Sequence, residues 1–197
     1  MRILSVSDFI EKSLDKKIEN KTLPDIDLIL SCGDLPPEYL EFLQRQLLCP
    51  LYYVKGNHDI RFEGYKPQGC INIHKKIIQI NPLLSIIGFE GSMWYNGNEN
   101  QYTEKNMKKM IRSAWFSLYK NRGVDIVITH APPFSIHDGD DLCHKGFMCF
   151  LKFIEKYSPK YFIHGHIHKS FDNSEDRVSV YGKTDIINTC GYNILEY

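Results

Sequence analysis

The sequence predicts an α/β fold in which short buried strands end in polar loops. Residues 2–7 (RILSVS) and 27–31 (DLILS) are apolar runs followed closely by Asp or Gly-Asp, as is typical of strands that lead into functional loops. Residues 33–48 then carry a helical apolar stripe, and residues 49–59 (CPLYYVKGNHD) predict a third strand and its loop. Strand, helix, strand in this order indicates parallel pairing through a right-handed crossover.

The first crossover segments differ in how strongly they predict a helix. Pro36 and Pro37 stand at the start of the 33–48 segment, where proline suits the first turn of a helix. Residues 11–22 (EKSLDKKIENKT) are highly charged and fit either a poor helix or a loop.

The remaining elements follow from changes in the apolar pattern. Residues 70–98 contain short alternating runs broken by Asn-Pro and Gly, which predict antiparallel strands. One amphipathic helix is predicted over 103–123, with Thr103 as N-cap and Gly123 at its end. The other expected elements are strands at 124–133 and 161–168, a helix around Leu142–Tyr157, and two or three strands in 177–197.

Chain length and charge limit the number of domains and the kinds of partner that the sequence predicts. The 197 residues, 43% of them hydrophobic, suffice for one sizeable core, and no repeat or linker divides them, so one domain over 1–197 is expected. Lys plus Arg and Asp plus Glu both number 24, so the charge gives no reason to expect nucleic acid as an obligatory partner.

The lack of targeting signals and the spacing of the cysteines lead us to expect a cytoplasmic protein. Strand-like sequence begins almost at Met1 without a secretory pattern, and no apolar run reaches the roughly 18 residues of a membrane span, so a cytoplasmic protein without a membrane partner is expected. The six cysteines form no C-x-x-C pair and are expected to be mostly reduced packing residues.

Polar residues with metal-binding chemistry follow five of the predicted strands. Since the carboxyl ends of such strands share one edge of the sheet, these residues are expected to converge. Imidazole, carboxylate and amide oxygen suit zinc, manganese, iron, cobalt or nickel, and the lack of thiolate in the set argues against a structural zinc site. The groups are Asp8, Gly33-Asp34, Gly56-Asn57-His58-Asp59, His130 and Gly165-His166-Ile167-His168.

The segment HGHIH contains three alternating histidines. His164, His166 and His168 lie at every second position of a strand-like stretch, so all three are expected on one face until the chain bends. Gly165 allows the backbone to approach whatever these histidines hold.

The ordered motifs D-x-x, GD, GNHD, H and GHIH resemble the calcineurin-like metallophosphoesterase family. The resemblance runs from Asp8 to at least His168. A bacterial branch related to enzymes that hydrolyse cyclic nucleotides and other phosphodiesters is indicated by the segments GFEGSMWYN, THAPPFSIHDG and CHKGF. The resemblance implies a four-layer αββα sandwich of two mixed β-sheets flanked by helices, with the site at the sheet edges.

The resemblance also implies roles for the matched residues. Asp8 and His168 would hold a first metal, Asp34 would bridge two metals, and Asn57, His130 and His166 would hold the second. A hydroxide activated by the two cations would attack the phosphorus. His58 would sit above the metals, either as the catalytic acid that protonates the leaving group or as a partner of the oxyanion, and Asp34 would serve the catalysis through its bridging position.

Ile10 is the one clear departure from the family pattern. The family places histidine two residues after the first Asp, and this chain has Ile10 there. The first metal would then be held by an oxygen-rich, weaker set that favours manganese or iron, with zinc or nickel also compatible. Glu11, His137 or His144 could also take the place of the missing imidazole.

Several polar and aromatic residues keep structural alternatives. Taken alone, Asp8, Asp34, Asn57 and His130 also fit turn, cap or core positions. A supporting or a surface position fits each of Asp59, His137, Asp138 and His144. Trp94 and Tyr95 fit either the pocket wall or the core, His74 and His164 are expected to be structural, and Lys105 to Lys109 are expected on a solvated helix face.

The sequence therefore predicts a phosphoesterase with one or two divalent metals and a small-molecule phosphoester as substrate. A phosphodiester is favoured over a phosphomonoester. The alternative is a metal-poor scaffold of the same fold that binds a protein or a nucleotide, although the intact GNHD motif at 56–59 disfavours it. The pattern specifies neither the substrate nor the oligomeric state.

Overall fold

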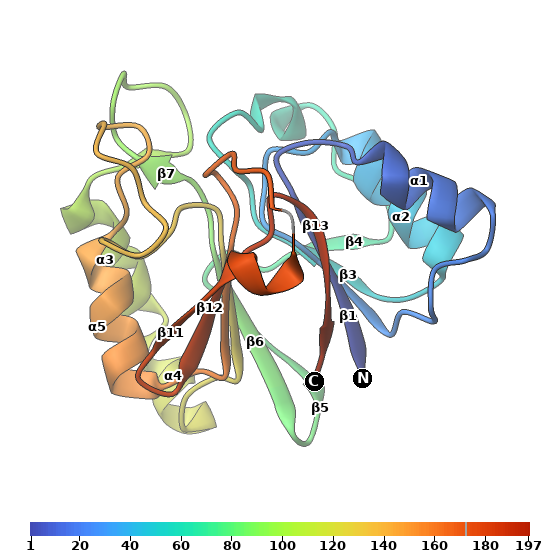
Figure 1. Cartoon of the computed structure of the whole chain (residues 1–197). Coiled ribbons are helices and arrows are strands. Elements are labelled where there is room, and N and C mark those ends of the chain that lie inside the picture. The colour runs from blue at the N-terminus through green and yellow to red at the C-terminus, as the bar shows by residue number, and fades with distance from the viewer. Residues whose placement is uncertain (172) are drawn as a thin grey trace.

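The computed structural model describes residues 1–171 and 173–197, which form a four-layer α/β sandwich. Two large β-sheets pack face to face, and α-helices cover the outer face of each (Figure 1). Five α-helices and two short 3₁₀ helices lie within the described ranges. The helix, sheet, sheet, helix order confirms the predicted fold class.

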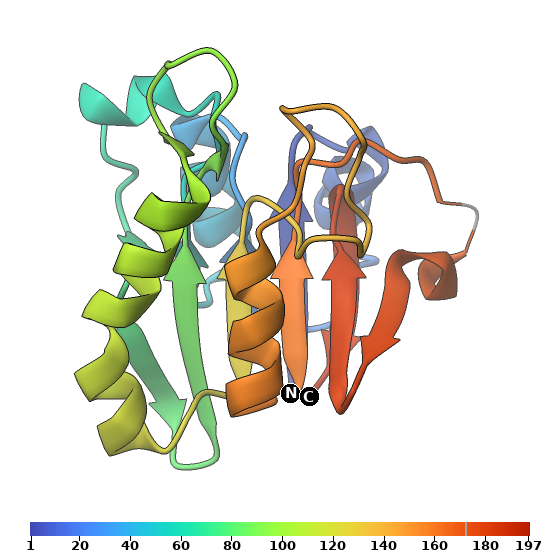
Figure 2. The same ribbon diagram turned by 90° about the vertical axis from the view of Figure 1, so that its left-hand side faces the viewer.

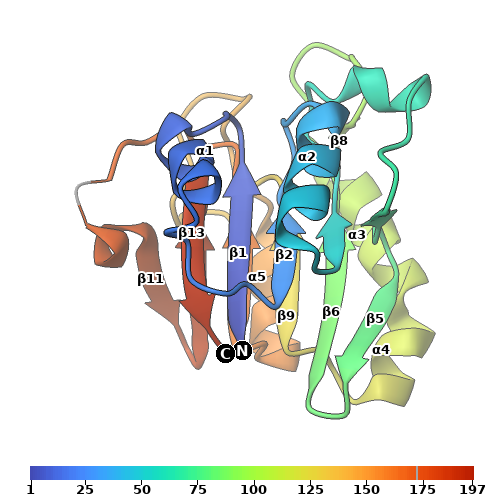
Figure 3. The same cartoon turned by 90° about the vertical axis from the view of Figure 1, so that its right-hand side faces the viewer.

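The first sheet carries the N-terminal strands. Its order is β13-β1-β2-β3-β4, formed by β1 (Arg2–Ser7), β2 (Leu28–Ser31), β3 (Leu51–Tyr53), β4 (Cys70–Asn72) and β13 (Gly191–Glu196). β1, β2 and β3 are parallel neighbours, as predicted, while β13 runs antiparallel to β1. Helices α1 (Lys12–Glu19) and α2 (Pro37–Leu47) cover the outer face of this sheet (Figure 3).

The second sheet carries the later strands. Its order is β11-β12-β10-β9-β6-β5, formed by β5 (Ile77–Asn81), β6 (Leu84–Phe89), β9 (Ile126–Thr129), β10 (Tyr161–His164), β11 (Val178–Tyr181) and β12 (Thr184–Asn188). Figure 2 shows its outer face covered by α3 (Glu104–Ser113), α4 (Trp115–Asn121) and α5 (Met148–Tyr157). The small elements are β7 (Ser92–Met93), β8 (Gln101–Tyr102), η1 (Ile60–Glu63) and η2 (Ser174–Arg177).

Side chains that alternate along the strands fill the space between the layers. Ile3 and Leu30 of the first sheet meet Ile128 and Ile163 of the second in a fully buried central core. Each such side chain contributes roughly 1.5–3 kcal/mol through burial. On the outer face of the second sheet a separate core contains Phe89, Phe150, Phe153 and Phe162.

Three predicted elements differ from the structure. Residues 11–22 do form a helix, α1, because Leu14 and Ile18 bury its apolar side. The single helix predicted over 103–123 is two helices that meet at Ala114, next to a bond from the Ser113 hydroxyl to the Met110 carbonyl (2.7 Å). Such side-chain bonds compete with the helical ladder and bend helices.

The helix predicted around Leu142–Tyr157 was wrong in its first turn and a half, since α5 begins only at Met148. The backbone N–H groups that would continue a helix bond elsewhere in the loop: that of Gly146 donates to Asp138 (3.0 Å) and that of Phe147 to the Pro132 carbonyl (3.1 Å). The chain in front of α5 is therefore a long loop, which occupies the sheet edge.

The segment 70–98 was only partly predicted. β5 and β6 form the expected antiparallel hairpin. β4, however, pairs parallel to β3 in the other sheet, and β7 pairs parallel to β8. Pairing partners are tertiary choices that an alternating pattern does not contain.

The parallel strands of both sheets point toward the same end of the molecule. In Figure 2 the arrowheads of β6, β9, β10 and β12 point to the end that carries the long loops, and Figures 1 and 2 both show the chain termini at the opposite end. The predicted site residues follow β1, β2, β3, β9 and β10, so all five motifs reach this edge.

Candidate metal centre

The left-handed backbone at three predicted ligands turns the chain sharply where a strand ends. The φ angles are +70° at Asp8, +57° at Asp34 and +67° at His166. Residues other than glycine rarely adopt this conformation, and it persists only where the surrounding structure stabilises it. Tertiary contacts therefore hold a sharp turn at three of the six predicted ligands.

Asp34, Asn57 and His130 converge on one point. The Nε2 atom of His130 lies 2.9 Å from Oδ1 of Asn57 and 3.2 Å from Oδ2 of Asp34. The three residues follow three strands, β2 and β3 of the first sheet and β9 of the second. Imidazole nitrogen, amide oxygen and carboxylate oxygen meeting in this way form a donor set suited to a divalent transition metal.

Backbone carbonyls fix the orientation of two of the predicted imidazole ligands. Nδ1 of His130 donates to the carbonyl oxygen of Cys32 (2.8 Å), and Nε2 of His166 donates to that of Cys143 (2.7 Å). Each ring therefore keeps its other nitrogen for the centre, as metal-ligating histidines do. Donor atoms of Asp34, His130 and His166 lie within 4.8 Å of one another.

Asp8 is held from three sides. Its carboxylate accepts the backbone N–H of His166 (2.8 Å) and the hydroxyl of Ser7 (2.6 Å). Nε2 of His168 lies 3.6 Å from Oδ1 of Asp8, with the His168 side chain 66% exposed. Gly165 is required here, because a Cβ atom at that position would lie 2.9 Å from the Asp8 carboxylate.

The buried ionisable groups of the centre shift one another's pKa values. Burial opposes ionisation of Asp34, but the charge and hydrogen bond of His130 hold the pKa of its carboxyl below the usual range. The same carboxylate raises the pKa of His130 although burial opposes its charge. Burial and the His130 charge lower the pKa of His166 to about 3. A proton on His130 thus supplies the positive charge that a metal ion would supply, so the residues fit a cation.

Asp8 and His168 form a second polar pair. Burial opposes ionisation of Asp8, but its contact with His168 and the charge of His130 lower the pKa of the carboxyl. The same contact raises the pKa of His168. Six predicted ligands therefore gather in two adjacent groups, and their ligand roles stay predictions.

His58 is exposed above these groups. Its backbone N–H donates to Oδ1 of Asp34 (2.8 Å), which ties its position to the predicted bridging residue. Its side chain lines a groove of about 550 Å³ together with Asn57, Glu63 and Asn98. An exposed imidazole in this place can reach a leaving group bound in the groove.

The expectation that His164, His166 and His168 share one face was wrong. β10 ends at His164, and the left-handed turn at His166 breaks the alternation. His164 is fully buried, and its Nε2 lies 2.9 Å from Nδ1 of His137, whose Nε2 contacts the Ser179 hydroxyl at 2.8 Å. The partly buried His137 and the buried His164 therefore form a hydrogen-bonded pair. The structural interpretation of His164 agrees with this geometry.

The proposed substitutes for the missing imidazole lie in different places. Ile10 is 42% exposed. The Glu11 side chain lies against Gly191, where a Cβ atom would meet it at 2.9 Å. His144 stands beside His166, with ring centroids 5.1 Å apart. The neighbour of Asp8 that the sequence did not suggest is the buried thiol of Cys190, whose pKa burial and the Asp8 charge raise to about 12.

The sequence left the position of Asp59 open and did not indicate Cys143 as a residue of the centre. Asp59 is buried and its Oδ2 accepts the backbone N–H groups of Asp34 and Gly56, both at 2.8 Å. Cys143 lies within 4.8 Å of donor atoms of His144 and His166, so a thiol does stand at the edge of a centre expected to lack one. All six cysteines are free, and four of them are buried packing residues as predicted.

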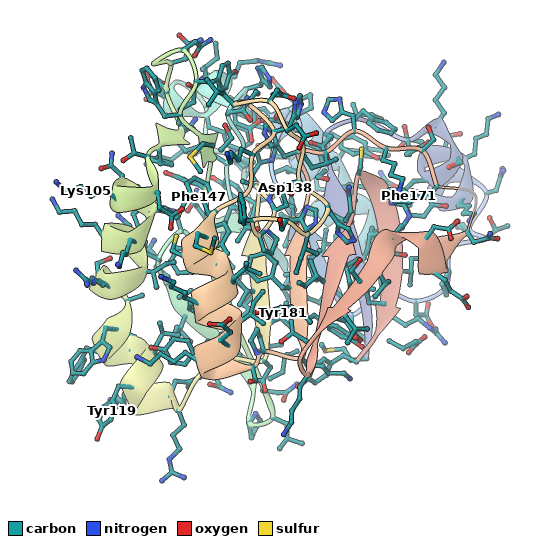
Figure 4. All side chains as sticks on the ribbon, turned by 60° about the vertical axis from the view of Figure 1, so that its left-hand side comes forward. Lys105, Tyr119, Asp138, Phe147, Phe171 and Tyr181 are labelled. Carbon is teal, nitrogen blue, oxygen red and sulfur yellow. The ribbon has the colours of Figure 1, made fainter. Side chains whose placement is uncertain are left out.

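The other named side chains divide between site and surface. Tyr95 reaches the centre, since its hydroxyl accepts from Nδ2 of Asn57 (3.4 Å), whereas Trp94 is exposed. His74 is a partly buried structural residue whose Nδ1 accepts the N–H of Glu90 (3.1 Å). Figure 4 shows Lys105 and Tyr119 pointing away from the helices that cover the second sheet, as expected for Lys105. Asp138 accepts the N–H of Gly146 (3.0 Å) within the loop.

The family model for calcineurin-like phosphoesterases matches residues 1–170, and so includes every predicted site residue. The chain belongs to the calcineurin-like phosphoesterase family. Membership supports a metal-binding hydrolase that acts on phosphoester bonds, and it agrees with the resemblance inferred from the motifs. The family generally binds divalent metals, for which the groups described above are candidate ligands.

Individual relatives of this calcineurin-like phosphoesterase are distant. The UPF0046 protein K07C11.7 of Caenorhabditis elegans is 24% identical over 219 aligned residues, which cover 98% of this chain and 70% of that protein. Among solved structures, TT1561 of Thermus thermophilus is similar with a TM-score of 0.64 and 16% identity, covering 96% of this chain and 88% of that one. YfkN from Bacillus subtilis, a calcineurin-like phosphoesterase, has a TM-score of 0.52 and 13% identity, with coverage of 98% and 83%. These structures show the fold.

One further property concerns the membrane. Across residues 1–171 and 173–197, every helix is too short or too polar to cross a bilayer.

Proposed function

We propose that this calcineurin-like phosphoesterase hydrolyses a phosphodiester, or a phosphomonoester, at a binuclear centre whose first metal is weakly held. One observation carries the proposal: oxygen atoms of Asn57 and Asp34 lie 2.9 Å and 3.2 Å from Nε2 of His130, and the Cys32 carbonyl accepts from Nδ1 of that ring and so orients it. Family membership supports the reaction class.

The chain's residues would divide between two cations. Asn57, His130 and His166 would hold the second metal, Asp8 and His168 the first, and Asp34 would contact both. Bound cations would neutralise the phosphoryl oxygens and supply a nucleophile at neutral pH. Because Ile10 offers no ligand, the first position is richer in oxygen donors and weaker, which favours manganese or iron over zinc or nickel.

His58 would protonate the leaving group. The backbone of His58 is fixed by its hydrogen bond to Asp34, and the His58 side chain is exposed. The groove beside it has room for a second ester group. General acid catalysis of this kind contributes typically 10²–10⁴-fold. The expected substrate is a small phosphoester, with neither nucleic acid nor a membrane as a required partner, and the expected location is the cytoplasm.

The test is hydrolysis of bis-p-nitrophenyl phosphate and p-nitrophenyl phosphate by manganese-loaded protein. Wild type is expected to cleave the diester faster, and His58→Ala is expected to lower kcat roughly 10²–10⁴-fold with unchanged metal content and melting temperature. Failure to hydrolyse either ester, with His58→Ala identical to wild type in every assay, would favour the scaffold that binds a protein or nucleotide.

A further inference from the structure

A second group of side chains that could hold a metal joins two residues of the loop 130–147 to His166, beside the centre. Sγ of Cys143 and ring nitrogens of His144 and His166 lie within 4.8 Å of one another. Asp138, labelled in Figure 4, belongs to the same loop in front of the second sheet. We name Cys143, His144 and His166 the loop site. Neither Cys143 nor His144 belongs to the ligand set assigned above.

The ring of His144 is oriented for metal binding. Its Nδ1 lies 2.7 Å from Oδ2 of Asp141, whose other oxygen accepts the N–H groups of Cys143 and His144. A carboxylate accepts only, so Nδ1 of His144 carries the proton and the neutral ring keeps a lone pair on Nε2. A carboxylate behind an imidazole is the usual support of a metal-ligating histidine. Asp141 also fixes the backbone on which the thiol stands.

The thiol of Cys143 faces the same space. It is partly buried and lies against the hydroxyl of Tyr95, which also accepts from Asn57. A bound divalent cation displaces a thiol proton, which passes to solvent as the metal–sulfur bond forms. The ring of His166 completes the triangle, and its Nε2 would give up its hydrogen bond with the Cys143 carbonyl (2.7 Å) to bind a cation in the loop site.

We propose that the loop site binds a divalent cation of the zinc type. One thiolate and two imidazoles select zinc or cobalt over manganese. Zinc bonds of roughly 2.0–2.3 Å place tetrahedral ligands roughly 3.5 Å apart, so donors within 4.8 Å need only a small closure. Three protein ligands would leave a fourth position for water or another ligand. The inference does not rest on phosphoester hydrolysis, although His166 is shared with the proposed second metal.

Cobalt(II) titration of the metal-free protein tests the loop site, because thiolate bound to cobalt gives a near-ultraviolet charge-transfer band that oxygen and nitrogen ligands lack. Wild type is expected to show this band. Cys143→Ser is expected to abolish it, and Asp141→Asn to weaken cobalt binding roughly 10–100-fold. Cys70→Ser, which removes another partly exposed thiol, is the matched control and should change nothing. A wild-type titration without the band overturns the proposal.

Alkylation gives a second measurement on the unmodified chain. Zinc is expected to slow the reaction of Cys143 with iodoacetamide at least tenfold, measured by mass spectrometry, and to leave Cys70 unchanged. Equal rates with and without zinc would overturn the loop site. Both results are independent of catalysis: a protein with the cobalt band and no esterase activity refutes the proposed function alone, and the reverse refutes the loop site alone.

Discussion

Asp59 accepts the backbone N–H of Asp34 at 2.8 Å, and so joins the loop after β3 to the loop after β2. The same oxygen accepts the N–H of Gly56 at 2.8 Å. Burial, and then the negative charge of Asp34, raise the pKa of Asp59 from 3.8 to about 6. The metal-free protein therefore carries an acidic group that resists ionisation at the place where its loops meet.

The raised pKa of Asp59 predicts that the metal-free protein is more stable to unfolding at acidic pH than at neutral pH. Because the folded pKa of Asp59 exceeds the unfolded value, its unfavourable contribution grows as pH rises from 3.8 to about 6 and is complete above that range. Ionisation of Asp59 should therefore lower the free energy of unfolding by on the order of 3 kcal/mol across this pH range. Asp59→Asn keeps an acceptor oxygen and should remove that slope, as measured by urea unfolding in chelator at pH 4, 5, 6 and 7. Parallel curves for the two proteins would contradict the assignment.

Gly56→Ala should damage the metal centre without a change in any ligand. A Cβ atom at Gly56 would overlap the carboxylate of Asp34. Displacing that carboxylate should weaken manganese binding roughly 10–100-fold in isothermal titration. Gly64→Ala is the matched control, because no atom lies within 4 Å of a Cβ at Gly64. Equal manganese affinity of both variants would refute the place given to Asp34.

Asp8→Ala should abolish phosphoester hydrolysis. The substitution removes a predicted ligand together with the acceptor that holds the backbone N–H of His166. A loss of roughly thousandfold or more in kcat is expected with manganese at saturating substrate. Asp25→Ala, at an exposed site, should retain full activity. A variant at Asp8 that stays within tenfold of wild type would exclude this carboxylate from the reaction.

Ile10→His should tighten the first metal. The substitution restores the spacing of the family's first motif, and the exposed position of Ile10 gives the imidazole room. A gain of at least about tenfold in affinity, or ~1.4 kcal/mol, is expected for manganese. Phe9→His is the neighbouring control, with a side chain of similar exposure, 44% against 42%. Unchanged affinity in Ile10→His would show that another residue already supplies the ligand.

Thr103→Ala tests the helix that starts beside the second sheet. The Thr103 hydroxyl accepts the N–H of Asn106 at 3.2 Å and so caps α3. Its loss should cost ~1 kcal/mol of unfolding free energy in urea. Thr22→Ala lies outside any helix N-terminus and should stay within about 0.5 kcal/mol of wild type. A cost at Thr103 no larger than at Thr22 would contradict the cap.

The sequence by itself determined that most of the predicted ligands lie at one edge of the sheets. Asp8, Asp34, Asn57, His130 and His166 each follow a predicted strand, and parallel strands present their carboxyl ends at one edge, so local pattern and strand direction were sufficient. The order of these motifs was also sufficient to indicate the family.

Only the tertiary structure decided how the residues are held. The left-handed turn at His166 that separates it from His164, the buried Asp59 and the thiol of Cys190 beside Asp8 all depend on contacts between distant segments. The loop 130–147, expected to be helical from Leu142, instead brings Cys143 and His144 to the centre. Alternation and spacing describe one strand or helix at a time, whereas these positions come from packing two sheets and their loops against each other.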